Sequence, residues 1–470
     1  MDILICAVPY VETEEAIMAP ALLKAAVQRH GFKAKALDLN IEVVNRAEEH
    51  PRKDEIYEFF YSQSYPLSLT DDIADIIDYC VDRICQHDAP VYALSLLTYS
   101  CQILTRWICA GIRQRKPDAK IVVGGSGIKK FVAEIHVNYC TTMRKMNLID
   151  DFISGDGELA LVEYLRGNKE YLGINTLDWT RIPDLNDNPY PDYDDYDFSQ
   201  YSKKELPLND SRGCVRDCEF CDIIEHWKKY QYRYADNIFA EMLYQSEKYE
   251  IKHFALRNSL VNGNMREFTK LVKLIADYNR DKERRNQISW AGYFIIRDIK
   301  HHKPELWEHM RDSNGEIWVG VESVIPKVRM EQMGKGFENQ AIDDHLEHAK
   351  QYNIPILLLM IVAYPTETLE DFEYTKQWFR DRSRYARDPV FAVLLSLASI
   401  LPETQLARKS KIYGIKQGDL PGIWINQNLN ITVEDRKQYL KELDQVVRDS
   451  GFVTNTNYET LKHSNDEFDS

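Results

Sequence analysis

The sequence lacks an apolar run long enough to cross a membrane. Its longest runs, IPILLLMIVAYP and FAVLLSLASIL, are shorter than the ~20 residues that a membrane-spanning helix needs. The amino terminus, MDILICAVPY, carries no basic residue and only a short apolar stretch, so we expect a buried first strand there and not a signal peptide. These absences predict a cytoplasmic protein without a membrane span.

Positive charge is also in deficit. The 470 residues include 59 Lys and Arg but 74 Asp and Glu, which gives a formal net charge of -15. Proteins bind nucleic acid largely by neutralising its phosphates, so nucleic acid is not an expected partner of this chain. The hydrophobic content of 44% is sufficient for packed cores, and the length indicates two or three domains. We expect a globular protein that acts on a small molecule.

Cysteine is scarce and unevenly distributed. Six of the nine cysteines are scattered, at positions 6, 80, 85, 101, 109 and 140, which is not the pattern of a disulfide framework. The other three, Cys214, Cys218 and Cys221, lie within eight residues, in SRGCVRDCEFCDI. In a reducing compartment, such a group of thiols binds metal more often than it forms disulfides.

Strand and helix patterns alternate along most of the chain and predict an α/β fold. Over residues 1–168, strands such as DILICAV, VYALSLLT and KIVVGG alternate with helical stretches, which is typical of a doubly wound, Rossmann-like parallel sheet. Residues 169–205, rich in Asp, Tyr and Pro, are expected to be a linker or covering segment. Six strands within residues 206–410 predict a partial (β/α)6 barrel. Residues 411–470 are expected to form a small, mostly helical extension.

Two kinds of metal site suit the cysteine spacing. The three cysteines follow the first strand of the predicted barrel, at the end where such folds place active sites. Three thiolates on a tight loop can bind three irons of a 4Fe-4S cluster and leave the fourth iron without a protein ligand. Alternatively, the thiolates and His226 could complete a structural zinc site. The spacing alone does not decide between these two sites.

The second half of the chain resembles the radical S-adenosylmethionine (radical SAM) superfamily. That family is marked by C-x3-C-x2-C with an aromatic residue before the third cysteine, here Phe220. Further matching segments follow in the family's order: KKYQYRYADNIFAEM, IWVGVES, MGKGFENQAIDDHLEHAKQYNIPILLLMIVAYPTETLEDF and ILPETQLARKSKIYGI. The resemblance covers about residues 206–415.

The resemblance implies two cofactors and an electron donor. Cys214, Cys218 and Cys221 would hold a 4Fe-4S cluster, and S-adenosylmethionine would chelate the open iron through its amino and carboxylate groups. An electron from a donor such as flavodoxin or ferredoxin would then cleave S-adenosylmethionine to methionine and a 5'-deoxyadenosyl radical. This radical would abstract hydrogen from a substrate that the sequence does not identify.

The resemblance also places S-adenosylmethionine contacts at the strand ends of the second domain. Glu322 and Ser323 match the position that contacts the ribose, although Ser323 also suits a helix N-cap. Asn258 lies near the position that holds the methionine amino group, where the family usually has an acidic residue. The backbone from Ile361 to Ala363 is expected to lie against the adenine, and Ala363 stands where the family usually has glycine.

The first domain resembles the cobalamin-binding domain that precedes many enzymes of this superfamily. The resemblance rests on VVGGSG and FISGDGE, but D-x-H-x-x-G, the motif that supplies a histidine to cobalt, is absent. A vestigial or purely structural Rossmann-like domain is therefore the alternative. Candidate cobalamin contacts follow the strands, where such folds bind ligands: Leu97, Thr98, Gly124, Gly125, Ser126, Gly155, Gly157 and Glu158. The glycines among them are equally compatible with ordinary tight turns.

These features predict a radical SAM enzyme. The leading hypothesis is a cobalamin-dependent methyltransferase that acts on an unactivated carbon of a small or unknown substrate. Cyclisation or rearrangement started by the radical, without methyl transfer, is one alternative. A non-catalytic module that binds zinc or an iron-sulfur cluster is another.

Overall fold

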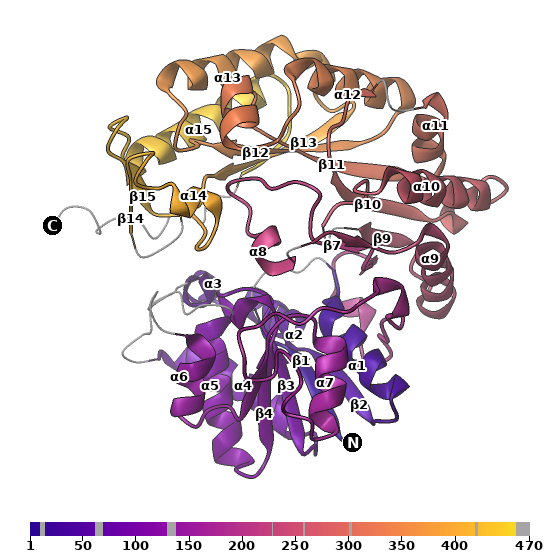
Figure 1. Ribbon diagram of the computed structural model, residues 1–470, viewed down its shortest axis with the longest axis vertical. Coiled ribbons are helices and arrows are strands. Elements are labelled where there is room, and N and C mark those ends of the chain that lie inside the picture. Colours follow the sequence, from indigo (N-terminus) through magenta and orange to yellow (C-terminus); the bar gives the residue numbers. More distant parts are fainter. Residues whose placement is uncertain are drawn as a thin grey trace. The chain divides into compact units, whose positions relative to one another are not determined.

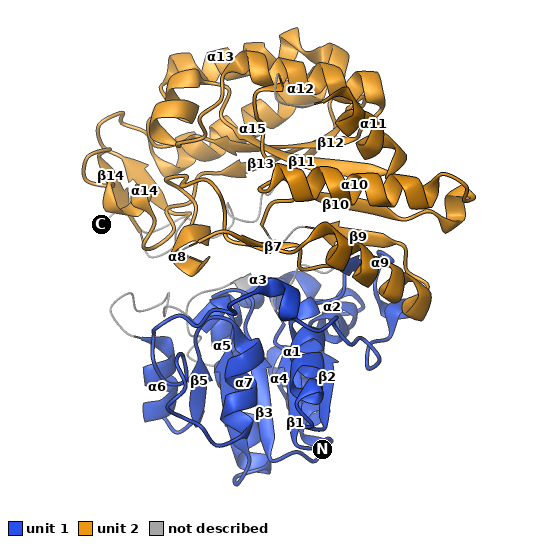
Figure 2. Ribbon diagram, turned by 45° about the vertical axis from the view of Figure 1, so that its right-hand side comes forward, with its two compact units in different colours: residues 1–207 blue, residues 208–470 orange. Residues whose placement is uncertain are grey.

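The chain forms two compact units. The computed structural model describes residues 1–9, 15–61, 69–128, 138–227, 229–256, 259–299, 303–418 and 422–456. The units comprise residues 1–207 and residues 208–470 (Figure 2). Each has its own sheet (Figure 1), and β6, which ends at the boundary, belongs to the sheet of the second unit. Among the described helices, none combines the length and apolar character that a membrane span requires.

Five parallel strands form the sheet of the first unit. They lie in the order β2-β1-β3-β4-β5, with the bounds β1 (Ile3–Ala7), β2 (Ala34–Asp38), β3 (Val91–Ser95), β4 (Lys120–Gly124) and β5 (Asp151–Ile153). In this order the direction of winding reverses between β1 and β3. Doubly wound sheets bind ligands beside such a switch point, at the carboxyl ends of the strands. The predicted doubly wound sheet is confirmed.

Helices cover both faces of this sheet. One face packs Ile3 and Ile5 against buried side chains of α1 (Met18–Arg29) and α7 (Gly157–Leu165). The other face packs Leu4 and Cys6 against the remaining helices. These are α2 (Leu39–Glu48), α3 (Lys53–Tyr61), α4 (Asp71–Cys85), α5 (Cys101–Arg115) and α6 (Tyr139–Lys145). Successive residues of β1 serve the two cores in turn because the side chains of a strand point alternately to opposite faces.

The Asp- and Tyr-rich segment that follows α7 packs along the first unit. Lys24 of α1 is buried, and its ammonium lies 3.2 Å from a carboxylate oxygen of Asp192 and 2.6 Å from one of Asp195. The hydroxyl of Tyr201 donates a hydrogen bond of 2.8 Å to Asp38, the residue that caps α2. The segment is therefore held by buried polar contacts to elements that lie more than 150 residues earlier in the sequence.

Seven strands form the sheet of the second unit, in the order β16-β13-β12-β11-β10-β9-β6. Their bounds are β6 (Glu205–Pro207), β9 (His253–Leu256), β10 (Ser289–Phe294), β11 (Gly315–Glu322), β12 (Ile356–Val362), β13 (Val390–Leu397) and β16 (Thr454–Thr456). The first six are the strands expected from the sequence, and the partial barrel is confirmed. The structure adds β16, which pairs in parallel with β13 and comes from the carboxyl-terminal extension.

Helices follow the strands of this sheet along the chain. They are α8 (Ile223–Trp227), α9 (Ala235–Tyr249), α10 (Met265–Asn279), α11 (Pro304–Asp312), the π-helix η6 (Lys327–Gln332), α12 (Asn339–Tyr352), α13 (Leu369–Asp381), α14 (Gln405–Arg408) and α15 (Val433–Asp449). Strand β11 shows the layering, because Ile317, Val319 and Val321 are buried while Trp318 and Glu322 alternate with them and are partly exposed. One face of β11 is therefore packed in the core, and the other is partly accessible.

The carboxyl-terminal extension is built into the second unit. Besides α15 and β16, it contains the hairpin of β14 (Ile415–Gln417) and β15 (Trp424–Asn426). Arg436 of α15 is fully buried and stacks on Trp424, with 3.6 Å between its guanidinium carbon and the ring centroid. Arg436 and the indole of Trp424 both donate to the carbonyl of Ala398, just after β13, at 2.6 and 2.9 Å. These contacts fix the extension to the carboxyl end of β13.

Replacing Lys24 by Met should loosen the Asp- and Tyr-rich segment. Loss of the buried ammonium leaves Asp192 and Asp195 close together without its charge. Because these carboxylates are partly exposed, we expect a cost of about 2 kcal/mol, below the ~3–5 kcal/mol of a fully buried pair. Limited proteolysis followed by mass spectrometry should detect faster cleavage within residues 169–205. The exposed Lys33→Met is the matched control, and equal cleavage rates in the two variants would contradict the prediction.

Candidate functional site

The three clustered cysteines lie on a loop between β7 (Ser211–Arg212) and α8. The loop leaves β7 at Gly213, whose φ of 78° favours glycine, and a Cβ there would lie 2.7 Å from the carbonyl oxygen of Lys229. The thiols of Cys214, Cys218 and Cys221 are free and partly exposed, whereas five of the other six cysteines are buried. The cysteine loop therefore presents thiols to a ligand, while nearly all other cysteines serve as core residues.

The electrostatic setting of these thiols suits a metal cluster. Burial raises the pKa of Cys218 and raises that of Cys221 to about 12, and the neighbouring thiols of the loop add to both shifts. The cations of Lys335 and Arg216 act in the opposite direction on Cys218. Thiolates are metal ligands, whereas thiols are not, so a bound cluster would have to supply the positive charge that keeps all three deprotonated. The donor set of three thiols on one loop fits this requirement.

The described residues do not favour the zinc alternative. There, no group of three or more Cys, His, Asp or Glu side chains is placed to hold a single metal ion. His226 lies 3.0 Å from Asp222, nitrogen to carboxylate oxygen, one helical turn away. A zinc site needs its ligands to converge on one point, whereas a 4Fe-4S cluster takes each thiolate at a different iron.

A segment that follows η6 holds the cysteine loop from one side. The backbone amide of Glu219 donates to the carbonyl of Met333 at 3.2 Å. Gly334 has a φ of 75°, and a Cβ there would lie 3.3 Å from the carbonyl oxygen of Asp217 and 3.9 Å from the Cα of Cys218. The glycine is therefore required where the two backbones pass closely.

The region around α14 holds the same loop from another side. The amide of Leu406 donates to the carbonyl of Glu219 at 2.8 Å. The buried side chain of Glu219 accepts a hydrogen bond of 3.0 Å from the hydroxyl of Tyr413 and pairs with Lys409. Glu219 directly follows Cys218, and its amide, its carbonyl and its carboxylate all fix the loop.

Glu322, a predicted S-adenosylmethionine contact, lies beside the cysteine loop. Glu322 ends β11 with a φ of 63°, an uncommon conformation for a residue other than glycine. Its carboxylate accepts a hydrogen bond of 2.9 Å from Lys335, whose ammonium also lies 5.7 Å from the ring centroid of Phe220. Burial lowers the pKa of Lys335, but Glu322 and Cys218 outweigh this and leave it above its usual value. Lys335 thus connects Glu322, Phe220 and Cys218.

The neighbouring strand end carries a second strained residue. Ala363 follows β12 with a φ of 56°, which explains why glycine suits this position in the family. The loop after it is fixed by Glu367, which accepts from the hydroxyl of Ser323 at 2.9 Å and from the amide of Tyr364 at 3.0 Å. Ser323 is buried and donates to this carboxylate, while Ile361 on β12 is partly exposed. Asn258 lies outside the described residues.

The candidate cobalamin contacts fall into two groups in the first unit. The loops after β3 and β4 lie together: the hydroxyl of Ser126 donates to the carbonyl of Leu97, and a Cβ on Gly125 would lie 2.3 Å from the carbonyl of Leu96. Leu97 is 41% exposed, Ser126 is exposed, and Thr98 and Gly124 are half-buried. This edge, beside the switch point, offers an accessible apolar side chain to a ligand.

The second group, after β5, is occupied by the protein itself. A Cβ on Gly155 would lie 2.4 Å from the backbone of Thr180, and a Cβ on Gly157 would lie 3.0 Å from Leu23. The buried carboxylate of Glu158 accepts from Asn188 at 3.2 Å. These contacts show why the residues are small or buried, and none of them requires a ligand.

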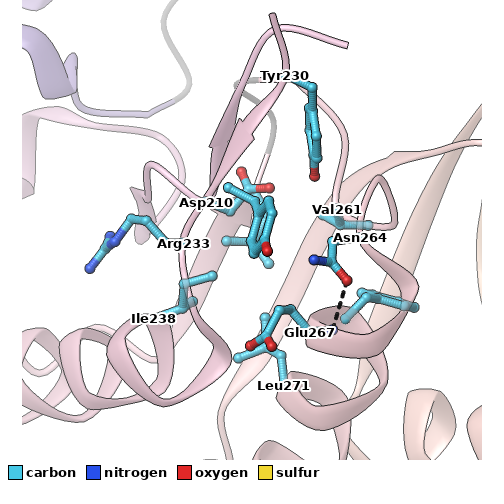
Figure 3. A pocket seen from close by; sticks show the side chains of 11 residues that line it. Asp210, Tyr230, Arg233, Ile238, Val261, Asn264, Glu267 and Leu271 are labelled. Carbon is cyan, nitrogen blue, oxygen red and sulfur yellow. Dashed lines mark hydrogen bonds between the residues drawn. The ribbon is translucent and has the colours of Figure 1, made fainter. Parts of the chain in front are cut away.

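A separate pocket lies near the β7–β8 ribbon, with β8 spanning Gln231–Tyr232 (Figure 3). Asp210, Tyr230 and Glu267 are among the side chains that line it, and none of the predicted site residues does. Burial raises the pKa of Asp210 to about 6. Arg233, at its rim, pairs with the buried Glu241 of α9 at 2.5 Å.

Lys335 and Glu219 are site residues to which sequence reasoning gave no role at the cluster. Lys335 stands in MGKGF between two glycines of positive φ, Gly334 and Gly336. A lone lysine between glycines was the available signal, but nothing in the sequence links it to Glu322, which lies 13 residues away.

Comparison with known proteins agrees with this geometry. A model of the radical SAM superfamily matches residues 208–379. An uncharacterized methyltransferase of Pyrococcus horikoshii is 25% identical over 276 residues, 54% of this chain and 56% of that protein. The cytidylyl-2-hydroxyethylphosphonate methyltransferase of Streptomyces wedmorensis is 20% identical over 64% of this chain and 62% of that protein. The chain thus spans less than two thirds of the length of these curated relatives.

Solved structures share the fold at lower identity. TsrM of Kitasatospora setae, a radical S-adenosylmethionine methyltransferase with cobalamin and a 4Fe-4S cluster bound, gives a TM-score of 0.67 at 14% identity, over 100% of this chain and 94% of that one. OxsB, a cobalamin-dependent S-adenosylmethionine radical enzyme, gives 0.65 at 13% identity, over 94% and 66%.

The partial parallel barrel and the three clustered thiols at its carboxyl edge together indicate an iron-sulfur protein that uses radical chemistry. Residues 208–379 match the radical SAM superfamily, and a Rossmann-like parallel sheet precedes the barrel in the chain. This confirms the predicted family and fold class, and with them the 4Fe-4S cluster and S-adenosylmethionine as its cofactors. Enzymes of this superfamily require a reductant.

The pKa of Glu367 should make the stability of the protein fall between about pH 4.5 and pH 7. Burial raises this pKa to about 7 from an ordinary value of 4.5, so the folded state keeps a proton that the unfolded chain releases. The stability linked to this proton is fully present below about pH 4.5 and is lost as the pH rises through 7, on the order of 3 kcal/mol. Thermal unfolding of Glu367→Gln across this range should give a flatter profile than wild type. The exposed Glu370→Gln serves as control, and parallel profiles for wild type and Glu367→Gln would refute the assignment.

Proposed function

We propose that this chain is a radical SAM methyltransferase that uses cobalamin to methylate an unactivated carbon of a small substrate. The observation that carries the proposal is the cysteine loop, whose three partly exposed thiols lie beside the paired charges of Glu322 and Lys335. When bound, the cluster and S-adenosylmethionine supply a 5'-deoxyadenosyl radical, and cobalamin supplies the methyl group.

The residues of the chain hold and orient these groups. Cys214, Cys218 and Cys221 would hold three irons and leave the fourth for S-adenosylmethionine. Glu322 would accept hydrogen bonds from the ribose hydroxyls, and the backbone at Ile361 to Ala363 would lie against the adenine. The positive φ of Ala363 turns the chain at the end of β12, which supports this use of the backbone.

Cobalamin is proposed to bind at the carboxyl edge of the first sheet. The support is the exposed Leu97 beside Thr98 and Ser126, next to the switch point between β1 and β3. The apolar side chain suits the flat face of a corrin. The contacts of Gly155 and Glu158 with the protein itself exclude them from our proposed set.

Two curated relatives are named methyltransferases and a third is named a putative methylthiotransferase. The two methyltransferases favour methyl transfer, and the TsrM structure holds cobalamin and a 4Fe-4S cluster together. The electron is proposed to come from a flavodoxin or ferredoxin in the cytoplasm, where thiols remain reduced. Radical cyclisation without methyl transfer is the outcome that product analysis has to distinguish.

Cys218→Ala should abolish cluster binding. Wild-type protein reconstituted anaerobically with iron and sulfide should turn brown, bind about four iron ions, and form 5'-deoxyadenosine from S-adenosylmethionine with a low-potential reductant. Cys218→Ala should lose the colour, because one iron loses its ligand. Its activity should fall at least ~100-fold, since even the loss of an outer-shell partner of a metal site costs about 10- to 100-fold.

Cys85→Ala is the matched control, since Cys85 is the partly exposed cysteine outside the loop. It should keep both the cluster and the cleavage activity. A colourless wild-type protein with one tightly bound zinc ion would refute the proposed function.

Leu97→Asp should weaken cobalamin binding by about tenfold or more, because a charge would replace apolar contact with the corrin. Hydroxocobalamin should co-elute with the wild-type protein in gel filtration as a red chromophore and dissociate from the variant. Leu177→Asp, at another exposed leucine of the first unit, should bind like wild type. A wild-type protein that retains no cobalamin would refute this part of the proposal and favour a structural Rossmann-like domain.

A further inference from the structure

Lys335 occupies a site that the surrounding backbone is shaped to receive. Its ammonium donates to the carbonyl of Gly320 at 3.0 Å and to the carboxylate of Glu322 at 2.9 Å. A Cβ on Gly320 would lie 2.5 Å from the Glu322 oxygen and 2.9 Å from the Lys335 nitrogen. The glycine in the segment GVES therefore leaves the space in which the ion pair lies.

The backbone on both sides of Lys335 is also fixed to the cysteine loop. Met333 accepts from the amide of Glu219, and Gly334 passes close to Asp217 and Cys218. The side chains of Lys335 and Glu322 are only 12% and 13% exposed, so water screens their charges weakly. Lys335 is thus a largely shielded cation whose neighbours in the chain hold it at the cysteine loop.

We propose that Lys335 is a positioning residue that couples the cluster to the S-adenosylmethionine pocket. It holds the Glu322 carboxylate toward the ribose, and its fixed positive charge beside the cysteine loop favours the reduced state of the cluster. This inference rests on the proposed function, because it assumes that Cys214, Cys218 and Cys221 hold a 4Fe-4S cluster.

The charge effect has a definite sign. Reduction adds one electron to the cluster and so increases its negative charge. A nearby cation stabilises that added charge and raises the reduction potential, whereas a nearby carboxylate lowers it, and both effects are strong where water is excluded. Lys335→Met should therefore lower the potential, and Glu322→Gln should raise it. The double variant should lie between the two single variants.

The test is a redox titration of the reconstituted protein, monitored by electron paramagnetic resonance without S-adenosylmethionine. Lys335→Met should have a lower midpoint potential than wild type, and Lys335→Arg, which keeps the charge, should restore it toward the wild-type value. Lys327→Met, at an exposed lysine of η6, removes the same charge at the surface and should leave the potential unchanged.

S-adenosylmethionine binding provides a second measurement. The change in the spectrum of the reduced cluster on titration with S-adenosylmethionine reports its affinity, which should fall about tenfold in Lys335→Met because Glu322 loses its fixed orientation. If Lys335→Met does not fold, a higher potential in Glu322→Gln still tests the charge effect. An unchanged potential in that case overturns the inference.

The outcomes separate the inference from the function on which it rests. A wild-type protein that takes up no cluster overturns the proposed function and this inference together. A wild-type protein with a reducible cluster, whose potential and affinity for S-adenosylmethionine are the same in Lys335→Met, overturns the inference alone.

Discussion

The hydrogen bonds of Glu219 are the constraint on which the site depends. Its amide bonds to Met333, its carbonyl to Leu406, and its carboxylate to Tyr413 and Lys409. Two cluster cysteines flank this residue, so their positions are set by segments more than 100 residues later in the chain. The geometry of the cysteine loop is complete only when β11, η6 and α14 have packed, although its motif occupies eight residues.

The backbone is strained at two strand ends of this site. Glu322 and Ala363 both take positive φ where β11 and β12 end, and such strain persists only where surrounding contacts determine it. Lys335 supplies these contacts for Glu322, and Glu367 supplies them for the loop after Ala363. Each strained residue therefore has a titratable partner that is largely shielded from water, and both partners lie at the edge of the barrel that carries the cysteine loop.

The sequence predicted the parts of the structure that local pattern controls. The strand and helix periods gave both sheets, and the motif spacing identified the three cysteines. What it missed depends on distant contacts: β16 pairs with β13 through Thr454 to Thr456, which show no strand period of their own, and Lys335 meets Glu322 only after η6 turns the chain back. The periodicity of apolar residues indicates which side of one helix or strand is buried. It does not indicate which side chains are brought together by elements that lie later in the chain.

The glycines of the first unit show why a motif there is weaker evidence than an exposed side chain. Gly125 and Gly127 are required because the loops after β3 and β4 cross. The carbonyls of Leu96 and Thr98 leave no space for a Cβ at these two positions. A ligand-binding and a purely structural domain would both need them. Leu97 differs, because it places an exposed apolar side chain beside the switch point, where doubly wound sheets bind ligands. The proposal that cobalamin binds here therefore depends on Leu97 more than on the glycine-rich motif at the same edge of the sheet.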